Sequence, residues 1–244
     1  MSKLPHAPLV EVIFEIRWNS TDRANLEKFQ LLIGSMFTAL QADFPNAINL
    51  RPDPAIPFNA FIGVPTHRFT NANGYPMYQL GPGVLSVNMI DSGYDWDSFM
   101  ATTKSIVSIF EQLSELSGQK VTLALKYLDF FKVNFSEIDL LAYIKKNFHL
   151  SVEAPYLSDS KAKTFSFATT YAVDMGTFAV TMNTGYNNVG GRQIEGIITE
   201  SNISKEIPFE ALNDYIANTL PSAHELLGQF FKELTKGELY ESFK

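Results

Sequence analysis

The sequence predicts an α+β protein in which antiparallel strands carry long helices on one face. Apolar and polar residues alternate from Pro8 to Trp18 with the period of two that is typical of a strand with one buried face. Apolar residues recur with helical spacing from Leu26 to Leu40 and again from Trp96 to Leu116. Shorter apolar stretches between Asn, Gly and Pro clusters indicate hairpins, as in an antiparallel sheet.

Turn and capping residues delimit the elements of the first half of the chain. Asn19-Ser20-Thr21-Asp22 supplies N-cap chemistry for the first helix. Gly81-Pro82-Gly83 closes a hairpin, and Gly118 stops the second helix. The predicted order is a strand over 8–18, a helix over 26–40, strands over 60–69, 75–80 and 84–90, and a helix over 96–116.

The second half repeats this order. A long apolar strand leads to a helix that Ser136 is expected to cap, and a C-terminal helix is expected to kink or break at Pro221. The predicted elements are a strand over 121–135, a helix from 136 to 148, strands over 163–173, 177–183 and 193–203, and a helix over 209–234.

We therefore predict two similar strand–helix–strands–helix halves, 1–118 and 119–244, that form one compact pseudo-symmetric unit. A curved antiparallel sheet would carry the long helices on one face, and one shared sheet and two separate sheets both remain open. This element order resembles that of helix-grip and TATA-binding-protein-like folds. A likeness in element order implies no function.

Composition excludes several classes of protein. The chain has 244 residues, of which 45% are hydrophobic, so it is not a disordered protein. It contains no cysteine, which excludes disulfide scaffolds, Cys-based zinc sites and cysteine nucleophiles. A net charge of −7 argues against binding of nucleic-acid backbones by the whole surface. No signal peptide and no apolar stretch of membrane-spanning length is visible, so we expect a cytoplasmic protein without a membrane anchor.

Catalytic and metal motifs are missing from the sequence. The four histidines, His6, His67, His149 and His224, have no metal-ligand spacing. No serine lies in a Gly-x-Ser-x-Gly elbow. The acidic cluster that begins at Asp91 and includes Asp95 and Asp97 is expected to sit at a helix N-terminus, stabilised by the macrodipole. We therefore predict no catalytic residue, no metal site and no cofactor.

Charged residues on the predicted strands form the candidate partner or ligand surface. Glu11 and Glu15 share a face of one strand about 13 Å apart, too far for a cooperating acid–base pair, and Arg17 continues the row. This row is either a solvated outer face or the lining of a concave binding surface. From the second half of the chain, the candidate surface also includes Lys126, Lys132, Arg192 and His224.

Four stretches resemble a known family. They are Ala7–Glu15, with its Pro-Leu-x-Glu-x-x-x-Glu strand; Leu85–Asn88 followed by Tyr94–Phe99; Lys126–Asp129; and a C-terminal group from His224 to Leu239. Together they resemble a sporadically distributed family of uncharacterised bacterial and archaeal proteins of similar length. Lys126 and Asp129 depart from the family, which tends to have arginine and asparagine there. The patchy distribution of the family implies a mobile or defence-associated gene context.

These observations favour a non-enzymatic protein-interaction or accessory protein, in a toxin–antitoxin or anti-phage defence context, with a protein partner or a second copy bound. One alternative is a small-ligand-binding protein or enzyme with an aromatic-lined pocket between sheet and helices. Another is nucleic-acid binding on the concave face of the sheet, which the net charge of −7 opposes.

Overall fold

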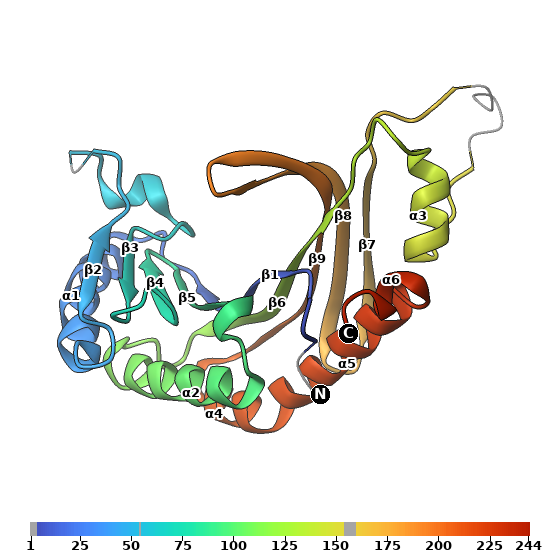
Figure 1. Cartoon of the computed structure of the whole chain (residues 1–244). Helices are drawn as coiled ribbons and strands as arrows, with labels where there is room; N and C mark the ends of the chain where they lie inside the picture. The colour runs from blue at the N-terminus through green and yellow to red at the C-terminus, as the bar shows by residue number, and fades with distance from the viewer. Residues whose placement is uncertain (1–3, 54, 154–159) are drawn as a thin grey trace. The chain divides into compact units, whose positions relative to one another are not determined.

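The computed structural model describes residues 4–53, 55–153 and 160–244. Within these residues, nine strands form one antiparallel sheet in the order β2-β3-β4-β5-β1-β6-β9-β8-β7 (Figure 1). The predicted α+β class is therefore confirmed, and the strands belong to one sheet rather than two. The strands are β1 (Leu9–Trp18), β2 (Asn46–Asn49), β3 (His67–Thr70), β4 (Met77–Gly81), β5 (Val84–Ile90), β6 (Lys120–Lys132), β7 (Ser166–Val173), β8 (Gly176–Val189) and β9 (Arg192–Pro208).

The longest helices, α1 and α2, lie in the N-terminal part of the chain, and α5 is the main C-terminal helix. The α-helices are α1 (Arg23–Leu40), α2 (Trp96–Leu113), α3 (Leu140–Phe148), α4 (Leu212–Asp214), α5 (Leu220–Leu234) and α6 (Glu238–Glu241). The tighter turns are the 3-10 helices η1 (Phe58–Phe61), η2 (Asp91–Gly93) and η4 (Phe209–Ala211), and η5 (Tyr215–Thr219) is a π-helical turn.

The chain divides into two compact units. Unit 1 comprises residues 1–10, 126–203 and 222–244, and unit 2 comprises residues 11–125 and 204–221. The predicted duplication, with halves 1–118 and 119–244 in one pseudo-symmetric unit, stays a prediction.

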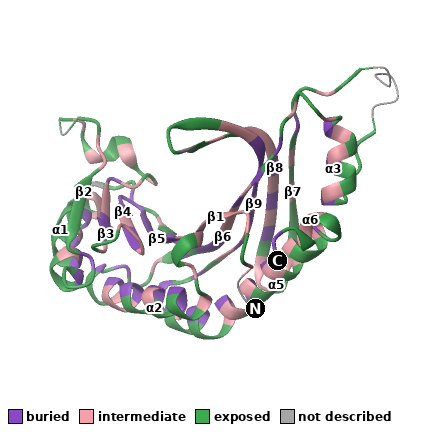
Figure 2. Cartoon of the chain, viewed as in Figure 1, coloured by how far each residue is buried: buried purple, intermediate pink, exposed green. Residues whose placement is uncertain are grey.

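The core of unit 2 lies between its strands and the helices α1 and α2. Alternate residues of β1 (Val12, Phe14 and Ile16) are at most 1% exposed. Trp18 continues this row and packs against Phe110 of α2, with ring centroids 5.2 Å apart. The buried side of α2 is visible as a purple stripe in Figure 2. The apolar face of β1 and the apolar stripe of α2 therefore pack together in one layer.

The core of unit 1 is a separate aromatic cluster. Phe131 of β6 packs edge-on against Phe148 of α3, with ring centroids 4.8 Å apart. Aromatic pairs prefer such edge-to-face contacts because of the ring quadrupole. The buried members of the cluster are Phe131, Val133, Leu140, Ile144, Phe148, Phe165, Met182, Ile197 and Phe243.

Three predicted strands of the sheet are wrong in their extent, and one short strand was not predicted. The strand expected over 60–69 is only four residues long, β3, because η1 and the left-handed Gly63 (φ +76°) precede it. The short edge strand β2 was not predicted, because its sequence Asn-Ala-Ile-Asn is fully exposed and lacks the pattern of a half-buried strand. In contrast, β8 and β9 extend well beyond the predicted 177–183 and 193–203.

The C-terminal helical stretch, which the sequence predicts to kink or break at Pro221, continues from α4 through a π-helical turn into α5. The π-helical turn η5 ends at Thr219, and α5 starts at Leu220. Proline lacks an N–H donor, and its ring would clash with the carbonyl group of Ala217, four residues earlier. The wider π turn, which contains Ala217, accommodates that ring.

The cap of α3 differs from the prediction. The helix starts at Leu140, and the Asp139 side chain accepts a hydrogen bond from the Ala142 N–H at 3.0 Å. The hydroxyl group of Ser136, the predicted cap, instead donates to Asn134 Oδ1 at 2.8 Å. Residues 136–138 therefore lie in a turn ahead of the helix, because a nearer aspartate satisfies the first amides.

We expect Asp139→Ala to lower the free energy of unfolding by about 1 kcal/mol, because it leaves an N-terminal amide of α3 without its side-chain acceptor. Ser136→Ala is the matched control and should change stability by less than about 0.5 kcal/mol. Urea unfolding followed by circular dichroism measures both. Equal losses in the two variants would contradict the assignment of the cap.

Candidate binding surface

The face of the unit 2 sheet opposite α1 and α2 carries polar side chains from four adjacent strands. Register places Glu11, Ile13, Glu15 and Arg17 of β1 opposite Ile90, Asn88, Ser86 and Val84 of β5. It continues to Gln79 of β4, which pairs with Ser86, and to Arg68 of β3, which pairs with Gln79. We call this surface the polar face. It consists of Glu11, Glu15, Arg17, Arg68, Gln79, Ser86 and Asn88.

A hydrogen-bond network centres on Asn88. The Asn88 side-chain amide donates to Glu11 Oε1 at 3.0 Å, and the Ser86 hydroxyl donates to Asn88 Oδ1 at 2.8 Å. Gln79 Nε2 also lies 3.5 Å from Asn88 Oδ1. Ser86 is 4% exposed and Asn88 is 3% exposed. These side chains are therefore held in position by one another, because buried polar groups keep their hydrogen bonds.

An ion pair forms the second part of the polar face. Arg17 donates to both oxygens of Glu15, with Nε–Oε1 at 2.6 Å and Nη2–Oε2 at 3.0 Å. Its remaining Nη1 group donates to the carbonyl oxygen of Gly63 at 3.0 Å. The hydrogen bond to Glu15 raises the pKa of Arg17 above its usual value. The two hydrogen bonds make a bidentate ion pair, which holds the side chains more firmly than a single-bonded surface salt bridge.

The charge of Arg68 acts on two neighbours, Glu11 and Tyr75. Burial raises the pKa of Glu11, while the hydrogen bond from Asn88 and the charge of Arg68 oppose this rise. Burial and the charge of Glu11 raise the pKa of Tyr75, and Arg68 opposes that rise too. Among the described residues, the buried Arg68 Nε atom has no hydrogen-bond acceptor. Arg68 therefore places a positive charge beside the partly buried Glu11 carboxylate.

The hydrogen-bond partners of each group define the chemistry of the polar face. Ser86, the hydroxyl in the network, donates to an amide oxygen rather than to a base, so it is not activated as a nucleophile. Both carboxylate oxygens of Glu15 accept hydrogen bonds from Arg17. Across the described ranges of the chain, no three His, Asp or Glu side chains converge as a metal site. The polar face thus offers donors, acceptors and charges of both signs.

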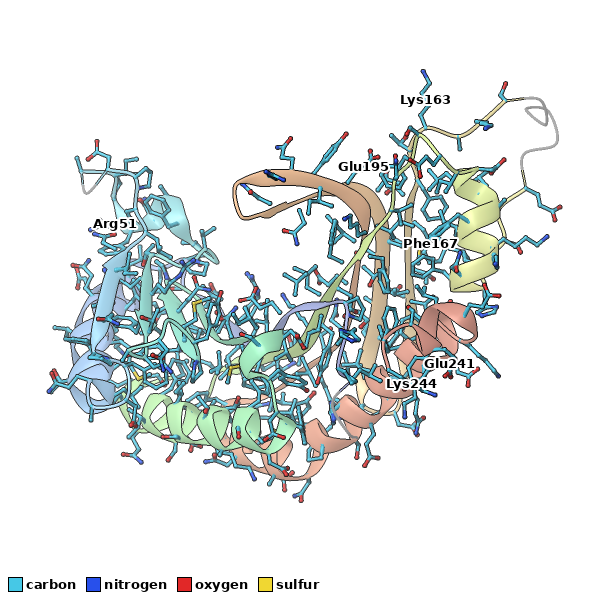
Figure 3. All side chains as sticks on the ribbon, viewed as in Figure 1. Arg51, Lys163, Phe167, Glu195, Glu241 and Lys244 are labelled. Atoms are coloured by element: carbon cyan, nitrogen blue, oxygen red, sulfur yellow. The ribbon has the colours of Figure 1, made fainter. Side chains whose placement is uncertain are left out.

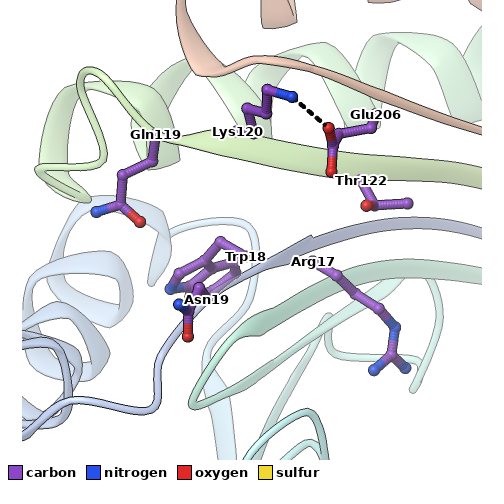
Figure 4. A pocket seen from close by; sticks show the side chains of 7 residues that line it. All are labelled: Arg17, Trp18, Asn19, Gln119, Lys120, Thr122 and Glu206. Atoms are coloured by element: carbon purple, nitrogen blue, oxygen red, sulfur yellow. Dashed lines mark hydrogen bonds and ion pairs between the residues drawn. The ribbon is translucent and has the colours of Figure 1, made fainter.

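A groove lies at the C-terminal end of β1 (Figure 4). Arg17 belongs both to the polar face and to the lining of this groove. Its volume is about 480 Å³. An exposed ion pair, Lys120 Nζ to Glu206 Oε1 at 2.8 Å, lies along one side. The lining residues are Arg17, Trp18, Asn19, Gln119, Lys120, Thr122 and Glu206.

The structure brings together three of the seven residues of the predicted surface. Glu11, Glu15 and Arg17 share one face, but Glu15 is only 8% exposed, so the row is not simply solvated. In unit 1, Lys132 and Arg192 are exposed, and Lys126 is partly buried.

His224 lies on α5, where its Nδ1 atom is 2.7 Å from the Tyr127 hydroxyl. Burial lowers the pKa of His224 to about 4, so the ring is neutral at physiological pH. Tyr127 follows Lys126 directly in β6, and successive side chains of a strand point to opposite faces. His224 and Lys126 therefore do not share a surface.

Four residues of the polar face were not predicted from the sequence: Arg68, Gln79, Ser86 and Asn88. Ser86 and Asn88 alternate with Leu85, Val87 and Met89 in β5, a period-two signal that marks a polar face. Arg68 carries no such signal, because β3 is only four residues long.

Comparison with known proteins adds little to the geometry. No family model matches the chain, and no curated protein matches its sequence. The chain is distantly similar to an unknown protein from Galdieria sulphuraria of known crystal structure, with 10% identity and a TM-score of 0.14 over 90% of this chain and 94% of that one. The resemblance to a sporadically distributed family stays a prediction. In the part of the chain that the structure describes, no helix combines the length and the apolar character that crossing a bilayer requires.

Proposed function

We propose that this chain is a non-enzymatic binding protein that holds another polypeptide against the polar face of unit 2. The observation that carries the proposal is the network of Glu11, Asn88 and Ser86, with the Glu15–Arg17 pair beside it. Such a surface is built in advance, so a partner meets ordered donors and acceptors at a lower entropic cost.

The mixed charge of the polar face favours a polypeptide over a nucleic acid. The polar face has two acidic side chains, Glu11 and Glu15, and two basic ones, Arg17 and Arg68. It therefore has no excess of positive charge. Binding to phosphate backbones depends on such a surplus, which releases counterions. The backbone and side chains of a polypeptide offer both donors and acceptors, which match an amphoteric surface.

Internal duplication belongs to the same proposal. Read inward from its two edges, the sheet runs β3-β4-β5-β1 after the short β2, and β7-β8-β9-β6. Each series contains one strand that precedes a helix and three strands that follow it. This mirrored order supports a duplicated, TATA-binding-protein-like arrangement, in which the face opposite the helices is the surface offered to partners. A toxin–antitoxin or anti-phage context rests on the family resemblance alone.

The groove at the end of β1 supports a second candidate, binding of a small polar ligand. Its volume of about 480 Å³ falls within the range of small-molecule sites. The Lys120–Glu206 ion pair and the Trp18 indole would meet a ligand that has both polar and flat apolar parts. Thermal-shift screening of a metabolite library against wild type and Lys120→Ala separates this candidate from polypeptide binding.

Charge removal on the polar face tests the main proposal. We expect the double variant Glu11→Gln/Arg68→Ala to bind the partner at least tenfold more weakly, because charge-assisted hydrogen bonds each contribute about 1.5–3 kcal/mol. Native lysate passed over immobilised wild type identifies the partner, and calorimetry with the purified partner measures the affinity of each variant.

Lys104→Ala is the matched control, since Lys104 is an exposed cation on α2, opposite the polar face. It should bind the partner as wild type does. Circular dichroism confirms that each variant is folded. Unchanged affinity in the double variant, or an equal loss in Lys104→Ala, would refute binding at the polar face.

A further inference from the structure

Strand β7 forms one edge of the sheet, and its sequence lacks the features that usually protect an edge. Its eight residues, Ser-Phe-Ala-Thr-Thr-Tyr-Ala-Val, include no charge, proline or glycine. Natural edge strands usually carry charges, prolines or bulges, or are very short. The opposite edge, β2, is four residues long and is soon followed by Arg51 and Pro52. The two edges therefore differ, and the sequence of β7 is typical of a strand that is paired on both sides.

The register with β8 shows which backbone groups of β7 point outward. The Phe165 carbonyl accepts a hydrogen bond from the Thr184 N–H at 2.9 Å, in the register that pairs Phe167 with Met182. Odd-numbered residues therefore bond to β8, because the hydrogen-bonding direction alternates along an antiparallel strand. Ser166, Ala168, Thr170 and Ala172 direct their N–H and C=O groups away from β8. Among the described residues, β8 is the strand that pairs with β7, and no second strand does.

The side chains of β7 are symmetric about Thr169. Phe167 and Tyr171 flank Thr169 on one face, and Tyr171 is 54% exposed. On the other face the residues are small: Ser166, Ala168, Thr170 and Ala172. A copy of the strand laid antiparallel about Thr169 thus sets aromatic against aromatic and small against small, with no like charges opposed. Self-complementarity of this kind is what a two-fold interface requires.

We propose that β7 pairs antiparallel with β7 of a second copy of this chain, about a two-fold axis at Thr169. Phe167 then lies opposite Tyr171 of the partner subunit, and the sheet continues from one copy into the other. The outward backbone groups of Ala168 and Thr170 bond to Thr170 and Ala168 of the partner subunit. This pairing is independent of the polar face, so each can fail without the other.

Cysteine cross-linking tests the register, since the chain contains no cysteine of its own. In the proposed pairing, Thr169 faces Thr169 of the partner subunit as a non-hydrogen-bonded pair, with Cα atoms about 4.5 Å apart. That separation suits a disulfide, whereas two Thr170 residues are offset along the strands beyond its reach. Under mild oxidation, Thr169→Cys should form the covalent dimer at least tenfold faster than Thr170→Cys. Equal rates, or faster cross-linking of Thr170→Cys, would overturn the proposal.

Sedimentation equilibrium of the full chain tests the dimer itself. Wild type should sediment at twice 27.3 kDa at micromolar concentration. Ala168→Lys brings two like charges close together at the axis and should weaken the dimer at least tenfold. Ala47→Lys, the same substitution at an exposed position of β2, should leave the dimer intact. A monomeric wild type, or equal weakening by Ala47→Lys, would overturn the proposal.

Discussion

Replacing Gly81 with alanine is expected to lower the free energy of unfolding by about 3 kcal/mol or more. Gly81 ends β4, and a Cβ atom there would overlap the Val64 carbonyl oxygen. It would also lie 2.7 Å from the Val64 carbonyl carbon and 2.9 Å from Pro65 Cα. These are backbone atoms, so the overlap is not relieved by rotating a side chain.

Hydrogen bonds hold that backbone close to the hairpin. The Thr66 N–H donates to the Leu80 carbonyl at 2.8 Å, and the Gly63 N–H donates to the Pro82 carbonyl at 2.7 Å. Moving the segment away from an alanine at position 81 would break these bonds. It would also displace the Gly63 carbonyl that Arg17 Nη1 contacts at 3.0 Å.

Gly34→Ala provides the matched control in the same unit. Gly34 lies inside α1, and a Cβ atom there would meet nothing within 4 Å. Alanine at this position should raise the free energy of unfolding by about 1 kcal/mol, because glycine has the lower helix propensity. Urea unfolding measures both variants. A Gly81→Ala protein within about 0.5 kcal/mol of wild type would contradict the close approach of the Val64–Pro65 backbone.

The second large effect is a pH dependence of stability that originates at Asp129 in unit 1. Asp129 is 6% exposed, and burial raises its pKa to about 7, although a hydrogen bond from Thr199 at 3.5 Å opposes the rise. The unfolded chain has a carboxyl pKa near 4. Between about pH 4 and pH 7, the folded protein therefore holds a proton that the unfolded chain releases.

A raised carboxyl pKa favours the folded state at low pH. The stabilisation is fully present below the unfolded pKa and is lost as the pH rises through the folded pKa. Each pH unit in this window is worth about 1.4 kcal/mol, so Asp129 should lower the free energy of unfolding by about 4 kcal/mol between pH 4 and pH 8.

Asp129→Asn should remove this decline and be the more stable protein at pH 8, because the amide is neutral at every pH. Urea unfolding at pH 4 and pH 8 gives the difference for each protein. Asp174→Asn, an exposed aspartate in the β7–β8 turn, should keep the wild-type pH dependence. Parallel pH profiles for wild type and Asp129→Asn would show that Asp129 is ionised in the folded protein.

The local sequence pattern was sufficient to predict the strands and helices that have a long apolar stripe. Alternation in β1 predicted that Glu11, Glu15 and Arg17 share one face, and the register with β5 confirms it. Helical spacing predicted α1 and α2. The short strand β2 escaped prediction, and the predicted extent of β3 was wrong, because four residues hold too few repeats of any period.

The sequence by itself determined the α+β class, the long helices and the polar side of β1, because hydrogen bonds and side-chain periods act over neighbouring residues. Only the tertiary structure decided which hydrogen-bond partners the polar side of β1 has. Asn88 reaches Glu11 across 77 positions of the chain, and Arg17 reaches the Gly63 carbonyl across 46. Strand pairing over such distances is set by the packing of the whole unit, which no local pattern encodes. The row of charges is therefore a partly buried, hydrogen-bonded network rather than a fully solvated face.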